Sequence, residues 1–271
     1  MKEVYIRRRV RFSAAHSYQN MPQGPGLPSG KYRRIHGHNY IVNLTCRGEL
    51  NQQTGMVVNI TDINRELKSV TEPLDGSFLE QDHPQAAWGI PTTENLAVWI
   101  WQSLEGKIPG ATLHLVEVKE KEDLWASYTG EKDPMKVYVT RTYEFSAAHR
   151  LHSDCLSDKE NLEIFGKCNN PNGHGHNYGL EVTLSGDLDT SRGVVCDIDQ
   201  VDEAVNTRVV NRFDHKHLNF DIPEFEGINP TSENVAVVIW EILFAELGDC
   251  LHKVCVRETE RNYFEYYGER N

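Results

Sequence analysis

Two histidine-bearing phrases occur twice in this sequence, in the same order. FSAAH spans Phe12–His16 and Phe145–His149, and HGHNY spans His36–Tyr40 and His174–Tyr178. Residues two apart on a strand point the same way, with Cα atoms about 6–7 Å apart, so both histidines of an HGH can reach one ion. A third histidine from the adjacent strand gives three ligands and an open fourth position, which is typical of catalytic zinc. The sequence therefore predicts two ligand sets: His16, His36 and His38, and His149, His174 and His176.

The histidines could instead have a purely structural role. Strand histidines are often satisfied by backbone carbonyls, and for a single HxH this interpretation is as good as the other. Repetition of the pair, each time with a third histidine in the same place, favours the metal site.

Further phrases repeat in the same order along the chain. GMVVNI at 55–60 matches GVVCDI at 193–198, and PTTENLAVWIW at 91–101 matches PTSENVAVVIW at 230–240. Self-similarity at a spacing of about 130–140 residues is too long for a solenoid repeat and fits domain duplication. We expect one domain over residues 1–130, a second over 135–271, and a linker at 130–134.

Composition excludes several classes of protein. No run approaches the roughly 18 apolar residues that a membrane span needs, and the charged N-terminus has no signal-peptide core. A cytoplasmic location is therefore expected. The six cysteines lack a CxxC pair, which argues against a disulfide framework and a zinc ribbon. A formal net charge of −12 disfavours nucleic-acid binding, so a phosphorylated substrate would need a local basic pocket.

Each copy has the pattern of strand, strand, helix, helix, strand, strand. In the second copy, apolar residues alternate along 136–149 and along the long strand that starts at His174. Apolar residues recur at helical spacing over 201–209, and 235–247 is apolar nearly all round, as a buried helix should be. Two closing strands follow at 250–258 and 263–267. The predicted class is α+β, with an antiparallel sheet covered by two helices in each copy.

The second copy resembles a known family over residues 136–268. The resemblance rests on FSAAH, on GKCNNPNGHGHNY at 166–178, on DHK at 214–216, on PTSENVA at 230–236 and on RET at 257–259. These phrases are similar to those of the 6-pyruvoyltetrahydropterin synthases, which are zinc-dependent, have the tunnelling fold (T-fold) and assemble as rings around a barrel. The first copy resembles the same family more loosely over residues 2–125.

The resemblance implies a role for each residue that matches the family motif. His149, His174 and His176 would bind zinc, and Cys168 would be the base that removes carbon-bound protons. Asp214 and His215 would form a proton-relaying dyad, and Glu258 would bind the amino-pyrimidinone edge of the pterin. Thr231 and Ser232 would line that pocket. The alternatives are an inert thiol at Cys168, a turn residue at Asp214, a helix cap at Thr231 and an exposed strand carboxylate at Glu258.

The first copy departs from this pattern. It keeps its three histidines, and Glu120 aligns with Glu258. The loop 29–35 has no thiol where Cys168 stands, and Asp75 is followed by Gly76 instead of a histidine. Both copies are therefore predicted to bind zinc, whereas only the second copy has the groups for proton transfer.

The implied activity is that of a lyase which converts 7,8-dihydroneopterin triphosphate to 6-pyruvoyltetrahydropterin with loss of triphosphate. Three alternatives stay open: a 6-carboxytetrahydropterin synthase of queuosine biosynthesis, an enzyme that forms a hydroxymethyl pterin, and a non-catalytic module that binds pterin or zinc. A homo-oligomer is expected. A trimer of two-domain chains would place the two copies in separate rings, whereas a dimer or tetramer would favour rings of four alternating domains.

Overall fold

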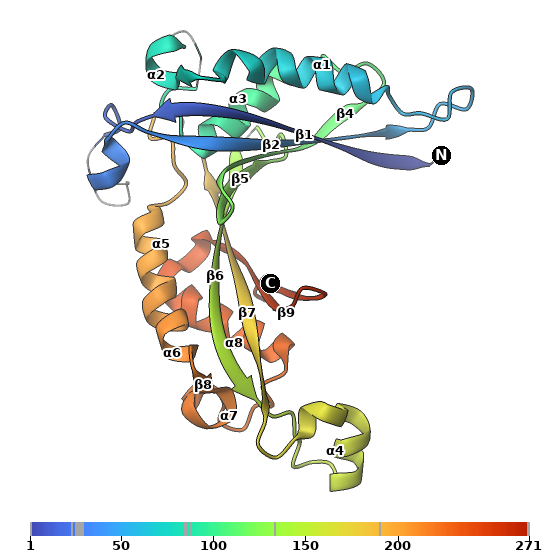
Figure 1. Cartoon of the computed structure of the whole chain (residues 1–271), viewed down its shortest axis with the longest axis vertical. Helices are drawn as coiled ribbons and strands as arrows, with labels where there is room; N and C mark the ends of the chain where they lie inside the picture. The colour runs from blue at the N-terminus through green and yellow to red at the C-terminus, as the bar shows by residue number, and fades with distance from the viewer. Residues whose placement is uncertain are drawn as a thin grey trace. The chain divides into compact units, whose positions relative to one another are not determined.

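A computed structural model of the chain describes residues 2–22, 24, 30–83, 86, 88–132, 134–189 and 191–269 (Figure 1). Part of the expected linker, residue 133, and residue 29 of the loop 29–35 lie outside the described residues. Contacts divide the chain into two compact units. The first unit comprises residues 1–140 and 185–197, and the second comprises residues 141–184 and 198–271. Each unit is described by itself.

The first unit is built on a long antiparallel hairpin, β1 (Glu3–His16) and β2 (His36–Glu49). Its register pairs His16 with His36 and Ala14 with His38, so all four side chains lie on the same face. The sheet continues from β2 through β4 (Thr112–Lys121) to β5 (Leu124–Tyr128), and β3 (Ser77–Phe78) adds a short parallel pair at β1.

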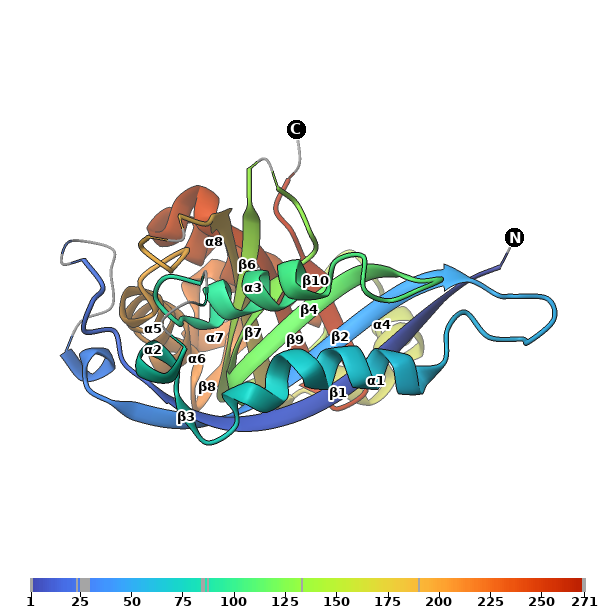
Figure 2. The same cartoon turned by 90° about the horizontal axis from the view of Figure 1, so that it is seen from above.

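Two helices of the first unit lie on one face of this sheet, α1 (Ile60–Thr71) and α3 (Thr93–Leu104) (Figures 1 and 2). The α1 helix buries one stripe of apolar residues, which includes Ile63, Leu67 and Val70. The α3 helix is buried nearly all round, and the Thr92 hydroxyl caps its first turn by accepting from the Asn95 N–H. A single turn, α2 (Leu79–Asp82), follows β3.

The second unit repeats this plan. Its hairpin strands are β6 (Lys136–His149) and β7 (His174–Asp187), whose first and last few residues respectively belong to the first unit. β7 pairs with β9 (Leu251–Thr259) and β9 with β10 (Asn262–Tyr266), both antiparallel, while β8 (Lys216–His217) pairs parallel with β6. The expected inward face of β7 is buried, from Tyr178 through Leu184.

The helices of the second unit are α5 (Ile198–Val205) and α8 (Ser232–Leu247), with α5 continued by a π-helical stretch (Asn206–Val210) and by α6 (Asn211–Phe213). The remaining helices are α4 (Asp158–Phe165) and α7 (Leu218–Asp221). Short 3-10 turns lie at Gly30–Arg33, Glu72–Leu74, Gly166–Asn169, Pro223–Phe225 and Gly248–Cys250.

The predicted α+β class and the order of the long elements are confirmed in both units. The predicted pattern omitted α4, although the Ser157 and Glu160 capping box marks its start in the sequence. Among the described residues, no helix combines the length and the apolar character that a membrane crossing requires.

Candidate metal and catalytic site

The structure gathers the second histidine set at one end of the β6–β7 hairpin. The Nε2 atoms of His149 and His174 lie 3.1 Å apart, and the rings of His174 and His176 have centroids 4.9 Å apart. One ligand atom from each histidine lies within 4.8 Å of the others, which suits coordination of a single ion.

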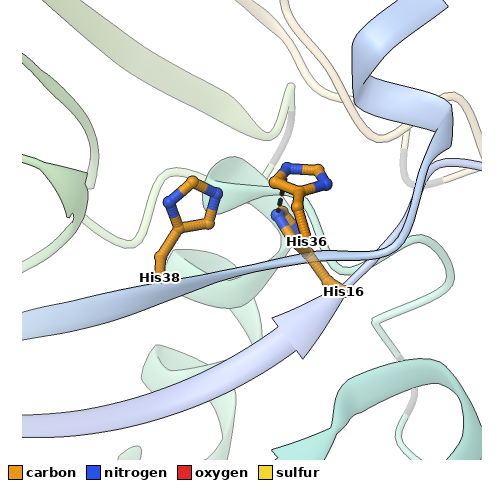
Figure 3. Close-up of side chains that lie close together, drawn as sticks. All are labelled: His16, His36 and His38. Atoms are coloured by element: carbon orange, nitrogen blue, oxygen red, sulfur yellow. Dashed lines mark hydrogen bonds between the residues drawn. The ribbon is translucent and has the colours of Figure 1, made fainter.

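The first histidine set has the same arrangement on the β1–β2 hairpin (Figure 3). The Nε2 atoms of His16 and His36 are again 3.1 Å apart, and both rings have centroids 5.0 Å from that of His38. A stacked aromatic pair, Phe12 with Tyr40, continues the same face of the hairpin, and Phe145 with Tyr178 does so in the second unit. The two copies therefore hold their histidines on equivalent supports.

The protein environment prepares these imidazoles to bind a cation. Nδ1 of His149 lies 2.7 Å from the Pro230 carbonyl, and Nδ1 of His16 lies 3.0 Å from the Pro91 carbonyl. A proton on Nδ1 therefore donates to the carbonyl and leaves the Nε2 lone pair for a ligand. Burial lowers the pKa of His16 to about 3 and also lowers the pKa of His149, which keeps both rings neutral.

Unsatisfied nitrogens show where an ion would fit. The buried Nε2 atoms of His38 and His176 have no hydrogen-bond partner among the described residues. In the first set, Nδ1 of His36 also lies near a carbonyl oxygen, that of Arg34 at 2.7 Å, so the facing Nε2 atoms of His16 and His36 have no proton between them. In the second set, the buried Nδ1 of His174 has no hydrogen-bond partner among the described residues. A divalent metal would satisfy all three nitrogens, so the residues present fit the implied ion.

Cys168 and Glu258 lie on the metal side of the second unit. Burial raises the pKa of the Cys168 thiol, and the nearby Glu258 charge raises it further. The Ser232 hydroxyl donates to Glu258 Oε1 at 2.8 Å, and the Asn262 amide donates to Oε2 at 3.2 Å. Although burial opposes ionisation, these hydrogen bonds hold the pKa of Glu258 below its ordinary value. The contact that Thr231 makes is a cap, since its hydroxyl accepts from the Asn234 N–H.

Asp214 and His215 form a hydrogen-bonded dyad on the other side of the hairpin. Nδ1 of His215 lies 2.7 Å from Asp214 Oδ2, and the Ser146 N–H donates to Asp214 Oδ1 at 2.7 Å. His215 lines an open hollow together with Ser146 and Asn177. Strand alternation places the Ser146 and Asn177 side chains opposite the histidine face. Among the described residues, no hydrogen bond joins the dyad to Cys168 within one unit.

A family model described as 6-pyruvoyl tetrahydropterin synthase matches residues 5–131 and, separately, residues 138–269. The chain belongs to this family. The two matched segments also confirm the tandem duplication predicted from the repeated phrases. Family membership makes the chain an enzyme of the lyase class, as the sequence predicted.

Known relatives match about half of the chain each. The 6-pyruvoyl tetrahydrobiopterin synthase of Homo sapiens is 47% identical over 132 residues, which cover 48% of this chain and 91% of that protein. The enzyme of the same name from Drosophila melanogaster is 46% identical over 133 residues, covering 48% of this chain and 79% of that protein. The solved structure of the Caenorhabditis elegans 6-pyruvoyl tetrahydropterin synthase shares 44% identity and a TM-score of 0.48, and covers 49% of this chain and 96% of that one.

The first unit of this synthase-family chain replaces the thiol with a phenol ring. The Tyr18 N–H donates to the Tyr32 carbonyl at 3.0 Å, just as the Leu151 N–H donates to the Cys168 carbonyl at 2.8 Å. Tyr32 therefore occupies the position equivalent to Cys168. It is buried and stacks on Tyr18, whose ring meets His16 edge-on with centroids 5.1 Å apart. Loop shortening hid this equivalence in the sequence.

The dyad position also differs between the units. The Ser13 N–H donates to Asp75 Oδ1 at 2.8 Å, which repeats the contact between Ser146 and Asp214. Gly76, with a φ of 75°, then stands where the second unit has His215. The hydrogen bond from the serine N–H to the aspartate is therefore present in both units. The two units differ in the next residue, which is His215 in the second and Gly76 in the first.

Sequence reasoning missed a polar cluster beside Cys168. The Arg150 guanidinium donates to Asn169 Oδ1 at 3.2 Å, and His152 Nδ1 lies 3.0 Å from the same oxygen. The available signal was the RLH that follows FSAAH directly in the second copy. This cluster places a cation next to the thiol loop in an otherwise acidic protein.

Proposed function

We propose that the second unit converts 7,8-dihydroneopterin triphosphate to 6-pyruvoyltetrahydropterin with loss of triphosphate, as a zinc-dependent lyase. The observation that carries this proposal is the meeting of the histidine set, Cys168 and Glu258 on one side of the β6–β7 hairpin. The names of the curated relatives support the same activity.

Each residue has a role in this proposal. His149, His174 and His176 hold zinc, which, when bound, would act as a Lewis acid toward oxygens of the substrate side chain. Glu258 anchors the pterin by accepting hydrogen bonds from its amino-pyrimidinone edge, and Ser232 orients that carboxylate. Cys168, as the thiolate, accepts a carbon-bound proton of the side chain, although burial and the Glu258 charge raise the pKa of this thiol in the protein without metal.

The proton relay needs a second copy of the chain. Among the described residues, Asp214 and His215 make no hydrogen bond to Cys168, so in this proposal a neighbouring chain supplies the dyad that serves the thiol. A homo-oligomer therefore belongs to the proposal, either a trimer of two-domain chains or a ring in which the two units alternate.

Chromatography of the product formed from dihydroneopterin triphosphate tests the activity. We expect 6-pyruvoyltetrahydropterin and triphosphate. Acetaldehyde with a carboxypterin would instead identify the enzyme of queuosine biosynthesis, and a hydroxymethyl pterin would identify the side-chain-cleaving activity. Binding without turnover would indicate a non-catalytic pterin module. The Cys168→Ala variant should retain zinc and lose turnover by at least 100-fold, which is the scale of general base catalysis.

Mixing two inactive variants tests the shared site. Chains with Cys168→Ala and chains with His215→Ala should regain part of the activity after subunit exchange, because one intact thiol can then meet one intact dyad. No regain after verified exchange would place the complete site within one chain. The expected cytoplasmic location is a separate prediction that cell fractionation would test.

A further inference from the structure

A loop in the first unit covers the start of α3. Residues 193–195 belong to this unit by their contacts. The Thr92 hydroxyl donates to the Gly193 carbonyl, and the Val195 N–H donates to Glu94 Oε1 at 3.3 Å. Gly193 has a φ of +77°, and a Cβ there would lie only 3.0 Å from the Asn95 amide and 3.1 Å from Thr92. Because Gly193 has no side chain, the loop can lie directly against the start of α3. The N-cap residue and the first three residues of the helix, 92–95, are buried.

The start of α8 in the second unit has the same local geometry without a cover. Thr231 caps the helix as Thr92 caps α3. The Asn234 amide donates to the Asn229 carbonyl at 2.8 Å, which repeats the bond from Asn95 to the Ile90 carbonyl at 2.8 Å. Glu233, however, is exposed, and Thr231 and Asn234 are only half-buried. The start of α3 is therefore covered by a loop, whereas the equivalent start of α8, which we call the acceptor surface, is exposed.

The chain also carries a free copy of the covering loop. Residues 55–58 repeat residues 193–196, and Gly55 has a φ of +70°. The Val57 side chain lies 2.6 Å from the Cβ position of Gly48, just as Val195 lies 2.8 Å from that of Gly186, so the two loops fold alike. Gly55 nevertheless has nothing within 4 Å of its Cβ position, and Met56 is 47% exposed.

We propose that residues 55–58 of one chain dock on the start of α8 in a second copy of this chain. By analogy with the filled contact, the Thr231 hydroxyl would donate to the Gly55 carbonyl, and the Val57 N–H would donate to Glu233. The free loop has no equivalent place on the first unit, because residues 193–195 already occupy the start of α3.

This contact is heterologous, since the loop and its acceptor are different surfaces, and repeating it produces a closed ring or a filament. In a ring built by this contact, first units alternate with second units. An assembly with all first units in one ring and all second units in another would not bring the loop to α8. Because Ser232 adjoins the acceptor surface and holds Glu258, the docked loop closes one side of that site. The inference rests on the internal repeat and not on the proposed reaction.

Cross-linking between differently tagged, co-expressed chains tests the contact. One chain carries Met56→Cys and the other Glu233→Cys, both with Cys155→Ser and Cys250→Ser to remove the exposed cysteines. A short bis-maleimide should give a two-chain product that contains both tags. The matched control replaces Glu233→Cys with Glu163→Cys, an exposed glutamate on α4 of the same unit, and should give at least tenfold less product. Equal product from both pairs, or none from the first pair in chains shown to co-purify, would overturn the proposal.

A charge reversal gives an independent readout. The Glu233→Lys variant removes the acceptor for the Val57 N–H, so its particle mass should fall toward that of one chain at concentrations where the Glu163→Lys control stays assembled. An unchanged mass at every dilution, or a wild-type protein that is already a single chain, would contradict the docked loop.

Discussion

At the scale of residues, the two copies differ at the thiol and at the dyad histidine. The sequence predicted both differences, because the family resemblance singled out Cys168 and His215 in the second copy, whereas the loop 29–35 has no cysteine and Gly76 follows Asp75 in the first. It could not predict that Tyr32 fills the thiol position, since loop length had changed and only the repeated backbone bond shows the equivalence. Nor could it predict the backbone strain at His215.

His215 has a φ of 57°, and it is the one non-glycine residue with positive φ in the described part of the chain. An L-residue in this region costs about 1 kcal/mol or more, and the first unit avoids that cost with Gly76. A strained residue that the other copy replaces with glycine is favoured by function and not by folding.

We therefore expect His215→Gly and His215→Ala to separate stability from activity. Both variants should lose at least 100-fold in turnover, because both remove the relay imidazole. The glycine variant should be more stable than the alanine variant by about 1 kcal/mol, because alanine keeps the unfavourable φ. Urea unfolding and steady-state kinetics measure the two effects. A more stable alanine variant would show that the backbone at this position is not strained.

At the scale of elements, the long hairpin positions the chemistry. Alternation along a strand was enough to predict that His174 and His176 share a face, because that periodicity is a property of any strand. It was not enough to place Asp214 and His215, because they precede a two-residue strand, β8, whose pairing with β6 depends on tertiary contacts. The face occupied by the dyad therefore came only from the structure.

The turn that leads into β7 has no room for a side chain. Gly173 has a φ of +71°, and a Cβ there would lie 2.6 Å from His217 Nε2 and 2.9 Å from the His149 carbonyl oxygen. Gly166 is a matched control, since it has a φ of +51° with nothing within 4 Å. Gly173→Ala should lower the free energy of unfolding by about 2 kcal/mol more than Gly166→Ala does, and should reduce metal content, because the overpacked turn displaces a ligand strand. Equal effects in urea unfolding would mean that backbone strain alone matters.

The start of α3 should make stability depend on pH. Burial raises the pKa of Glu94 from 4.5 to about 7, and the hydrogen bond from the Val195 N–H only partly offsets this. Because the folded protein favours the neutral carboxyl, its contribution is complete below about pH 4.5 and is lost as the pH rises toward 7.

Glu94→Gln should therefore raise the free energy of unfolding at pH 8, by up to about 3 kcal/mol, and change it little at pH 4.5, where the wild-type carboxyl is already neutral. Urea unfolding at the two pH values measures the difference. The exposed Glu163→Gln substitution is the control and should show no pH-dependent gain. A gain of the same size at both pH values would show that packing, and not ionisation, is responsible.

At the scale of the whole molecule, both units keep the same histidine geometry, whereas the proposed proton-transfer groups occur only in the second unit. The facing Nε2 atoms are 3.1 Å apart in both sets, and both sets direct Nδ1 of the first histidine at a proline carbonyl. Buried, neutral imidazoles without an ion would leave unsatisfied nitrogens in both units, which costs stability. Because the first set lacks the thiol, we propose that a metal bound there would serve the fold.

The purified protein should accordingly contain two zinc ions per chain. His16→Ala and His149→Ala should each lower the zinc content to about one ion per chain, because each removes the most buried ligand of one set. Only His149→Ala should abolish turnover directly, since the thiol and the carboxylate that we propose anchors the pterin belong to the second unit. His16→Ala should instead lower the thermal midpoint of the first unit, and added zinc should raise that midpoint in the wild type but not in the variant. Metal analysis together with calorimetry distinguishes these cases. One ion per wild-type chain, unaffected by His16→Ala, would show that the first histidine set is a remnant that no longer binds metal.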